Sequence, residues 1–168
     1  MLRKKIDEML DCYSDKELEE IYWAIHYYHN AFLFRKNLQD KGVSLSEYDD
    51  PQEIMDLWDN TFAHQISEAV KKSIYYEQFR WHIFSYEKQS CMKNDEARKA
   101  FDFVEKNEVF IMYQKSPTVL LCKNAQQLVS TDFDSEQDVY VFDTDATWTY
   151  VHTHEEMCGP YFYQVKSK

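Results

Sequence analysis

The stretch Asp138–His152, which reads DVYVFDTDATWTYVH, decides the fold class. Two runs rich in aromatic and β-branched residues, Val139–Phe142 and Thr147–His152, flank a short polar connection at residues 144–146. Such runs are typical of strands, and a connection this short favours antiparallel pairing. Further runs of the same kind lie at Val109–Gln114, Thr118–Leu121 and Tyr161–Val165. We also assign a strand to Trp81–Tyr86, and expect a mainly antiparallel sheet of about five strands.

The residues before this region have helical periodicity. Apolar residues at helical spacing predict a helix over residues 2–12 and a second one from 15 to about 39, which Ser14 and Glu17 begin as a capping box and Gly42 ends. A polar loop at 43–49 precedes a third helix, with Asp50 as N-cap and Pro51 as first residue, whose apolar stripe runs to Val70. Asn94 or Asp95 is expected to cap a further short helix. Helices first and strands later indicate an α+β fold, with N-terminal helices packed on a C-terminal sheet.

Composition limits the functions that this chain can have. Its 168 residues, with two glycines and three prolines, are expected to form a single domain, with residues 1–45 as a helical extension and 50–163 as the core. The net charge of −11 argues against nucleic acid and anionic membranes as partners. No export signal or membrane span is recognisable, and four widely spaced cysteines indicate reduced thiols, so we expect a cytoplasmic location.

Three blocks of sequence carry a resemblance: Trp81–Lys88 (WHIFSYEK), Asp138–Asp143 (DVYVFD) and Thr147–Phe162 (TWTYVHTHEEMCGPYF). Their order and spacing resemble an uncharacterised family of small proteins from Bacillus and its relatives, known only as a domain of unknown function. The resemblance covers roughly Asp50 to Phe162 and leaves the helical segment before residue 45 outside. It implies a bacterial, cytoplasmic protein and implies no particular chemistry.

The pair His152 and His154 is the sharpest chemical motif. Residues i and i+2 of a strand point to the same face, so two imidazoles can converge on one metal ion such as Zn²⁺, with Cys158 or Glu155 as a third ligand. The alternative is an aromatic sheet face that Trp148 and Tyr150 share with the histidines. An H-x-H pair without a fixed third ligand is weakly specific, so we expect no cofactor and keep zinc as the alternative.

Acidic residues are unusually concentrated near the C-terminus, where no lysine or arginine occurs between Lys123 and Lys166. The pairs Asp132/Asp134 and Asp143/Asp145 can supply oxygen ligands to Mg²⁺ or Ca²⁺, although aspartates at strand ends more often form turns. Aromatic residues alternate with these acids. Together they suggest an exposed surface for a basic protein partner, built from Asp132, Asp134, Asp138, Tyr140, Asp143, Asp145, Trp148 and Tyr150.

Two classes of function remain after these exclusions. The chain has no G-x-S-x-G motif and too few glycines for a phosphate-binding loop, which disfavours nucleophilic and nucleotide-dependent catalysis. We favour a protein-binding module, such as an immunity-type inhibitor of a basic partner, because the acidic feature extends over residues 124–165 whereas a metal motif would rest on three residues. The alternative is a small metal-dependent hydrolase or metal-binding protein that uses His152, His154 and Cys158. Aromatic residues spread around the helix at 15–39 also suggest a homodimer through that helix.

Overall fold

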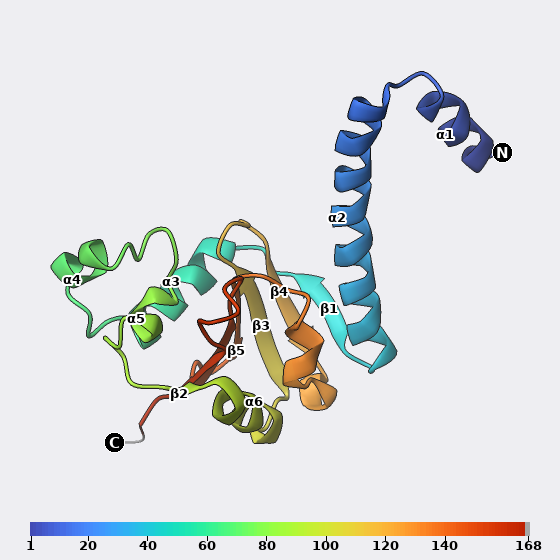
Figure 1. Ribbon diagram of the computed structural model, residues 1–168. Coiled ribbons are helices and arrows are strands. Elements are labelled where there is room, and N and C mark those ends of the chain that lie inside the picture. The colour runs from blue at the N-terminus through green and yellow to red at the C-terminus, as the bar shows by residue number, and fades with distance from the viewer. Residues whose placement is uncertain (167–168) are drawn as a thin grey trace. The chain divides into compact units, whose positions relative to one another are not determined.

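The computed structural model describes residues 1–166 and shows an α+β protein with N-terminal helices and one antiparallel sheet, as predicted (Figure 1). The sheet has seven strands in the order β1-β4-β3-β5-β6-β7-β2, so it is open, with β1 and β2 at its edges. Its strands are β1 (Ser44–Glu47), β2 (Met92–Lys93), β3 (Glu108–Tyr113), β4 (Val119–Lys123), β5 (Val139–Asp143), β6 (Trp148–His152) and β7 (Tyr161–Gln164). The five central strands are those predicted, and the two edge strands were not.

The second and third helices begin where their capping residues predict, whereas Asn94 and Asp95, the predicted caps of the later short helix, lie inside that helix, whose N-cap is Lys93. Helix α1 (Leu2–Leu10) is followed by α2 (Asp15–Asp40), and the Glu17 carboxylate accepts hydrogen bonds from both the backbone N–H and the hydroxyl of Ser14. The Asp50 carboxylate caps α3 (Pro51–Phe62) by accepting from the Glu53 N–H. The remaining helices are α4 (Glu68–Ser73), α5 (His82–Ser85) and α6 (Asn94–Phe103), with 3₁₀ turns η1 (Ala125–Gln127) and η2 (Ser130–Phe133).

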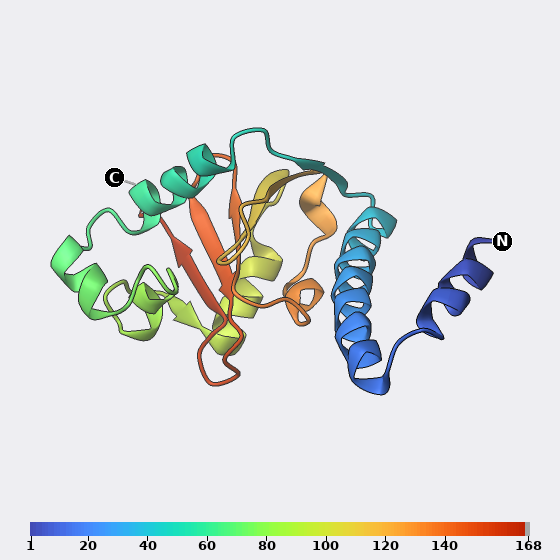
Figure 2. The same cartoon turned by 90° about the horizontal axis from the view of Figure 1, so that it is seen from above.

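Aromatic side chains fill the space on both faces of the sheet. On one face, Trp58 and Phe62 of α3 pack edge-on against Tyr140 and Phe142 of β5. On the other face, Phe101 of α6 stacks on Tyr150 of β6 with ring centroids 4.4 Å apart and contacts Trp148. The helices α3 and α6 therefore lie on opposite sides of the strands (Figure 2). Because both faces are covered, the aromatic residues of β5 and β6 are buried whichever way they point.

Three sequence predictions are wrong. The run Trp81–Tyr86 forms the short helix α5 and its flanking turns, because Trp81, Ile83 and Phe84 are all buried against one face of the sheet and a strand would divide neighbouring residues between two faces. The predicted loop at 43–49 contains β1, which pairs with β4. The predicted third helix ends at Phe62, and a second one begins after residue 67.

Contacts divide the chain into two compact units, residues 1–37 and 38–168. The division falls inside α2, close to the end of the predicted helical extension. The expectation that the chain forms a single domain stays a prediction. Within residues 1–166, none of the helices combines the length and the apolar character that crossing a membrane requires.

Candidate functional site

A hollow of about 350 Å³ opens at the end of the sheet where β5 begins and β6 ends. These two strands pair with Val139 opposite His152, so the segment that precedes β5 and the segment that follows β6 lie together at this end of the strands. The lining residues come from α6, from the segment before β5 and from the segment after β6: Arg98, residues 134–137, residues 152–156, Gly159 and Pro160. The size lies at the lower end of the ~300–1,000 Å³ that ligand pockets span.

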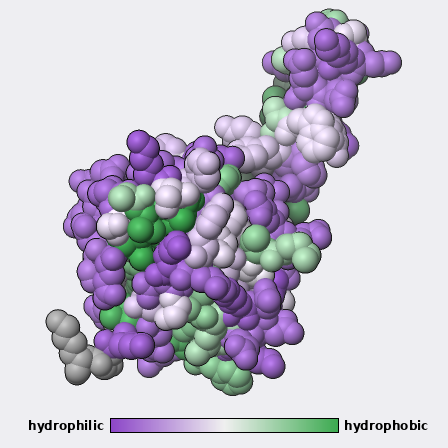
Figure 3. Space-filling view, turned by 60° about the vertical axis from the view of Figure 1, so that its left-hand side comes forward, coloured by the Kyte–Doolittle hydropathy of each residue, from purple (hydrophilic) through white to green (hydrophobic). Residues whose placement is uncertain are grey.

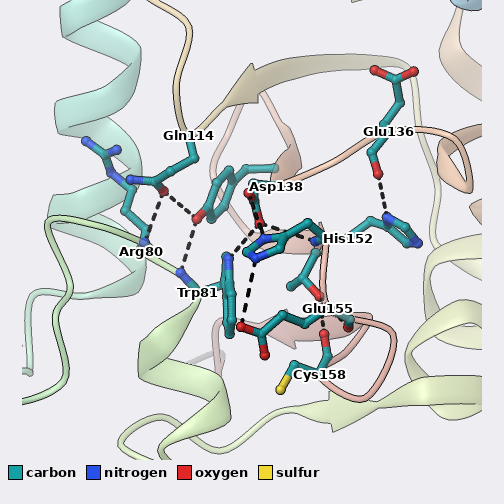
Figure 4. A network of polar contacts seen from close by, with 11 residues as sticks. Arg80, Trp81, Gln114, Glu136, Asp138, His152, Glu155 and Cys158 are labelled. Atoms are coloured by element: carbon teal, nitrogen blue, oxygen red, sulfur yellow. Dashed lines mark hydrogen bonds and ion pairs between the residues drawn. The ribbon is translucent and has the colours of Figure 1, made fainter.

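Asp138 connects the hollow to the core. The residue has a positive φ of 51° and is only 6 % exposed, and its carboxylate accepts hydrogen bonds from the Trp81 indole N–H at 2.9 Å and from His154 Nδ1 at 2.8 Å (Figure 4). A carboxylate only accepts, so His154 carries a proton on Nδ1 and turns Nε2 outward. Asp138 thereby fixes both the orientation and the tautomer of the imidazole, as carboxylates hydrogen-bonded to the far nitrogen of a histidine do in many catalytic and metal sites.

The same network continues away from the hollow into the core. The backbone N–H of Trp81 donates to the Tyr140 hydroxyl, and that hydroxyl donates to the side-chain carbonyl of Gln114 at 2.6 Å (Figure 4). Gln114 also accepts from the backbone N–H of Arg80 at 3.0 Å. Burial raises the pKa of Tyr140 well above its ordinary value, so the hydroxyl keeps its proton and acts as a fixed donor. These bonds link Asp138, which borders the hollow, to the buried residues between the sheet and α5.

His152 lines the hollow from the last position of β6. Its Nδ1 lies 2.9 Å from the backbone carbonyl of Glu136, which can only accept, so this imidazole is also protonated on Nδ1 (Figure 4). Burial lowers its pKa, and the backbone hydrogen bond opposes that shift only in part. At neutral pH, His152 is therefore an uncharged ring whose Nε2 can accept a hydrogen bond.

The charge of the hollow is predominantly negative. Four carboxylates line it, and one guanidinium, Arg98, leaves an excess of three negative charges before the imidazoles are counted. Arg98 pairs with Asp134 at 2.6 Å, while Glu155 Oε1 lies 3.8 Å from His154 Nε2 and its side chain is half exposed. A bound group with positive charge would gain from this field, since the surrounding protein focuses it.

The predicted acidic residues have separate roles in the structure. Asp132 is almost completely buried, pairs with Lys41 at 2.6 Å and accepts from the Val129 N–H. Asp143 accepts from the backbone N–H groups of Thr147 and Trp148, which makes it a turn former between β5 and β6. Asp145 is exposed in that turn. Of the predicted binding residues, Asp134 alone lines the hollow.

The aromatic members of the predicted surface lie in the core. Tyr140 and Tyr150 are 0 % exposed and Trp148 is 2 % exposed. They therefore do not form the exposed aromatic surface that the alternation with acids indicated, because helices cover both faces of the sheet. The Tyr150 hydroxyl is buried and has no hydrogen-bond partner in the described part of the chain.

The two imidazoles do not continue one strand face. β6 ends at His152, and the ring of His154 contacts Phe79 at 5.0 Å between ring centroids, near α5. Cys158 is partly buried, and burial together with Glu155 raises the pKa of its thiol, which disfavours the thiolate that zinc requires. Within residues 1–166, no three histidine, cysteine or acidic side chains are placed to hold one metal ion. His152, His154 and Cys158 do not form such a group.

Sequence reasoning missed two features of the site. Arg98 lies on the predicted short helix but has no neighbouring signal that marks it. The pairing of Asp138 with His154 had a usable signal, because the hairpin connection fixes the register and places residue 138 opposite residue 153.

Comparisons with known proteins identify the chain only at the level of a family. The model of the family described as Domain of unknown function (DUF4275) matches residues 32–162, which include every residue that lines the hollow. The match begins earlier than the resemblance indicated, at residue 32 instead of about residue 50. No curated protein and no solved structure matched the chain.

Proposed function

Since the chain belongs to the DUF4275 family, whose description assigns no activity, we propose from its own site that it is a protein-binding module for a basic partner. The hollow beside β5 and β6 receives a lysine or arginine side chain of that partner. The observation that carries this proposal is the lining itself: four carboxylates against one guanidinium around about 350 Å³. Immunity-type inhibitors of bacterial toxins are the class of binding protein that we consider first.

The geometry supports a directional contact. Oxygen atoms of Glu155 and Glu156 lie at the exposed rim, where carboxylates speed encounter with a cation and reject anions. Deeper in the site, His152 presents an uncharged Nε2 that can accept a hydrogen bond from a guanidinium or ammonium group. The hydrogen bonds of His152 to Glu136 and of His154 to Asp138 hold both imidazoles before a ligand binds, which lowers the entropic cost of binding.

A second hollow has the same sign of charge. It measures about 370 Å³, lies beside β1 and α3, and is lined by Glu47, Asp49, Asp50 and Glu53 without a basic residue. Its presence supports a cationic ligand in general and leaves two places for the contact. We place the principal contact at the first hollow because that one also contains oriented imidazoles.

The test uses defined probes. Arginine-containing peptides, with alanine-substituted peptides as blanks, are titrated into the full chain by calorimetry at low and high salt. We expect salt-sensitive binding that Glu155→Gln with Glu156→Gln weakens roughly tenfold, since each rim charge contributes up to ~1 kcal/mol. The matched control is Glu19→Gln with Glu20→Gln, which removes the same charge from the exposed surface of α2. Equal weakening by both pairs, or by Asp49→Asn alone, would refute this placement.

Metal binding is the second candidate, and one observation favours it. Both imidazoles direct Nδ1 to a protein oxygen, so Nε2 is the nitrogen left to bind a metal ion, an arrangement that metal-ligating histidines commonly have. Elemental analysis of untagged protein purified without added metal tests this candidate. Zinc near one ion per chain that disappears in His152→Ala with His154→Ala would support it, and a metal content unchanged by those substitutions would reject it.

A further inference from the structure

We propose that the N-terminal helices α1 and α2 form a docking surface for a second copy of this chain. The large apolar side chains of α2 are exposed to an unusual degree: Tyr22, Trp23, Ile25, Tyr27, Tyr28 and Phe32 are each between 55 % and 79 % exposed. They point to several sides of the helix, since neighbouring residues differ by about 100° around its axis. A helical stretch that is apolar all round is normally buried, so residues 21–34 of α2, which carry no charge, require a cover on more than one side.

In the proposed dimer, helix α1 adds further apolar side chains to the contact. Its apolar residues Leu2, Ile6 and Met9 recur at helical spacing, yet the helix buries none of its residues. Only four residues, 11–14, connect α1 to α2. Two copies therefore bring four helices together, each with exposed apolar side chains, which is the composition of a helix bundle.

The low net charge of residues 1–37 favours a second copy of the chain as the partner of these helices. Residues 21–34 of α2 contain no charged side chain, and charged residues are similarly depleted at the centre of protein interfaces, where tyrosine, tryptophan and phenylalanine are enriched. Residues 1–37 contain six lysines and arginines against seven acids, so this segment carries one of the eleven net negative charges. Two identical chains repel each other least here, whereas a basic partner is attracted to residues 38–168.

The exposed area is sufficient for a stable contact. A tyrosine or tryptophan side chain buries ~150–250 Å² when it is covered completely, so the exposed aromatic and aliphatic residues of α2 offer on the order of 700 Å². A standard interface uses about 800 Å² from each partner. In Figure 3, the part of the surface that belongs to the N-terminal helices carries large pale side chains, because tyrosine and tryptophan stand near the middle of the hydropathy scale.

The four tryptophans provide a direct measurement in the unmodified chain. Trp58, Trp81 and Trp148 are at most 2 % exposed, whereas Trp23 is 58 % exposed, so acrylamide quenching of fluorescence reports on Trp23 alone. We expect sedimentation velocity to show twice the monomer mass as concentration rises, and quenching of Trp23 to fall over the same range. Trp23→Phe assigns the quenched signal to this residue.

Charge insertion tests the location of the contact. Tyr27→Glu places a carboxylate within the uncharged stretch and is expected to shift association to at least tenfold higher concentration. The matched control is Phe103→Glu, which changes an aromatic residue that is 88 % exposed on α6 and leaves association unchanged. Circular dichroism establishes that both variants keep their helices, and the quenching data do not depend on either.

Three results would overturn the proposal. The first is a monomer at every concentration with Trp23 quenched freely throughout. The second is a monomer whose Trp23 is shielded even when dilute, because residues 38–168 of the same chain would then be the cover. The third is a dimer that Phe103→Glu disrupts and Tyr27→Glu does not. None of these results affects binding of arginine peptides at Glu155 and Glu156, so the two proposals fail separately.

Discussion

Residues 1–37 and residues 38–168 use the same kinds of side chain in opposite ways. In the second unit, rings such as Trp58, Tyr140 and Phe101 are fully buried between a sheet and its helices. In the first unit, Trp23 and Tyr28 are exposed by more than half of their surface. Aromatic content alone therefore does not distinguish a core from a docking surface. The difference is whether other elements cover the rings: the sheet and its helices cover those of the second unit, whereas most rings of α2 remain exposed.

The largest expected difference in the free energy of unfolding is between substitutions of two tryptophans, one from each unit. Trp58→Ala removes a fully buried ring whose indole N–H donates to Thr149 at 3.0 Å, and we expect it to lower the free energy of unfolding by about 3–5 kcal/mol. Trp23→Ala in dilute protein is expected to change it by less than ~0.5 kcal/mol. Denaturant unfolding followed by near-UV circular dichroism measures both. Comparable losses would mean that residues 1–37 are packed as tightly as the sheet.

A smaller effect is expected where a buried carboxylate holds the candidate site. Asp138→Ala leaves the Trp81 indole N–H buried without a partner, which costs ~1–3 kcal/mol of the free energy of unfolding. It also frees the ring of His154, whose Nδ1 resonance in NMR should lose its hydrogen-bonded shift. Asp145→Ala, in the exposed turn, is the control with an effect below ~0.5 kcal/mol. If both substitutions had the same small effect, Asp138 would not organise the hollow.

The pH dependence of stability sharpens the comparison further. The pKa of His152 is lowered below its ordinary value of 6.5, chiefly by burial, so the unfolded chain takes up a proton at a higher pH than the folded chain does. The contribution of His152 to the free energy of unfolding is therefore fully present above pH 6.5, and it decreases as the pH falls through and below that value. His152→Asn keeps an N–H donor and removes the titration. We expect the variant to lose less stability between pH 7 and pH 5, and parallel curves would contradict this.

Thiol reactivity distinguishes the two units without a change in stability. Cys12 is exposed in the first unit, while burial raises the pKa of Cys91 to about 11 and that of Cys122 to about 12. Only the thiolate reacts with alkylating agents, so Cys12 should be modified first and Cys122 only as fast as the chain unfolds. Mass spectrometry after timed alkylation reads the order. Rapid labelling of Cys122 would show that the sheet opens frequently.

The central strands were predictable because their pattern is local. β5 and β6 contain β-branched and aromatic residues bounded by turn formers, and Asp143 forms the turn as an aspartate at a strand end usually does. β1 and β2 were missed because they are short edge strands, and the segment that forms β1, SLSE, has no apolar alternation. Trp81–Tyr86 was assigned wrongly for a related reason: a buried helical turn and a buried strand have the same composition.

The candidate site was only partly predictable. His152, His154, Glu155 and Asp134 were identified as notable residues, and all four line the hollow. Their partners were not found, because Arg98 is on a separate helix and Asp138 reaches His154 through strand pairing. The acids that were expected to form one surface have separate roles instead: Asp132 pairs with Lys41, Asp143 forms a turn, and Asp138 orients His154. A charge pattern along the chain does not determine which side chains meet in space.

The sequence by itself determined the fold class, the starts of α2 and α3, the central strands and the excess of negative charge. Each of these depends on the nature of neighbouring residues, so a local pattern is sufficient. The tertiary structure alone decided that Tyr140, Trp148 and Tyr150 are buried, that Asp138 orients His154, and that the rings of α2 remain exposed. Those outcomes depend on which distant segments cover a side chain. Burial and hydrogen bonding arise from contacts between such segments, and the residue type alone does not determine them.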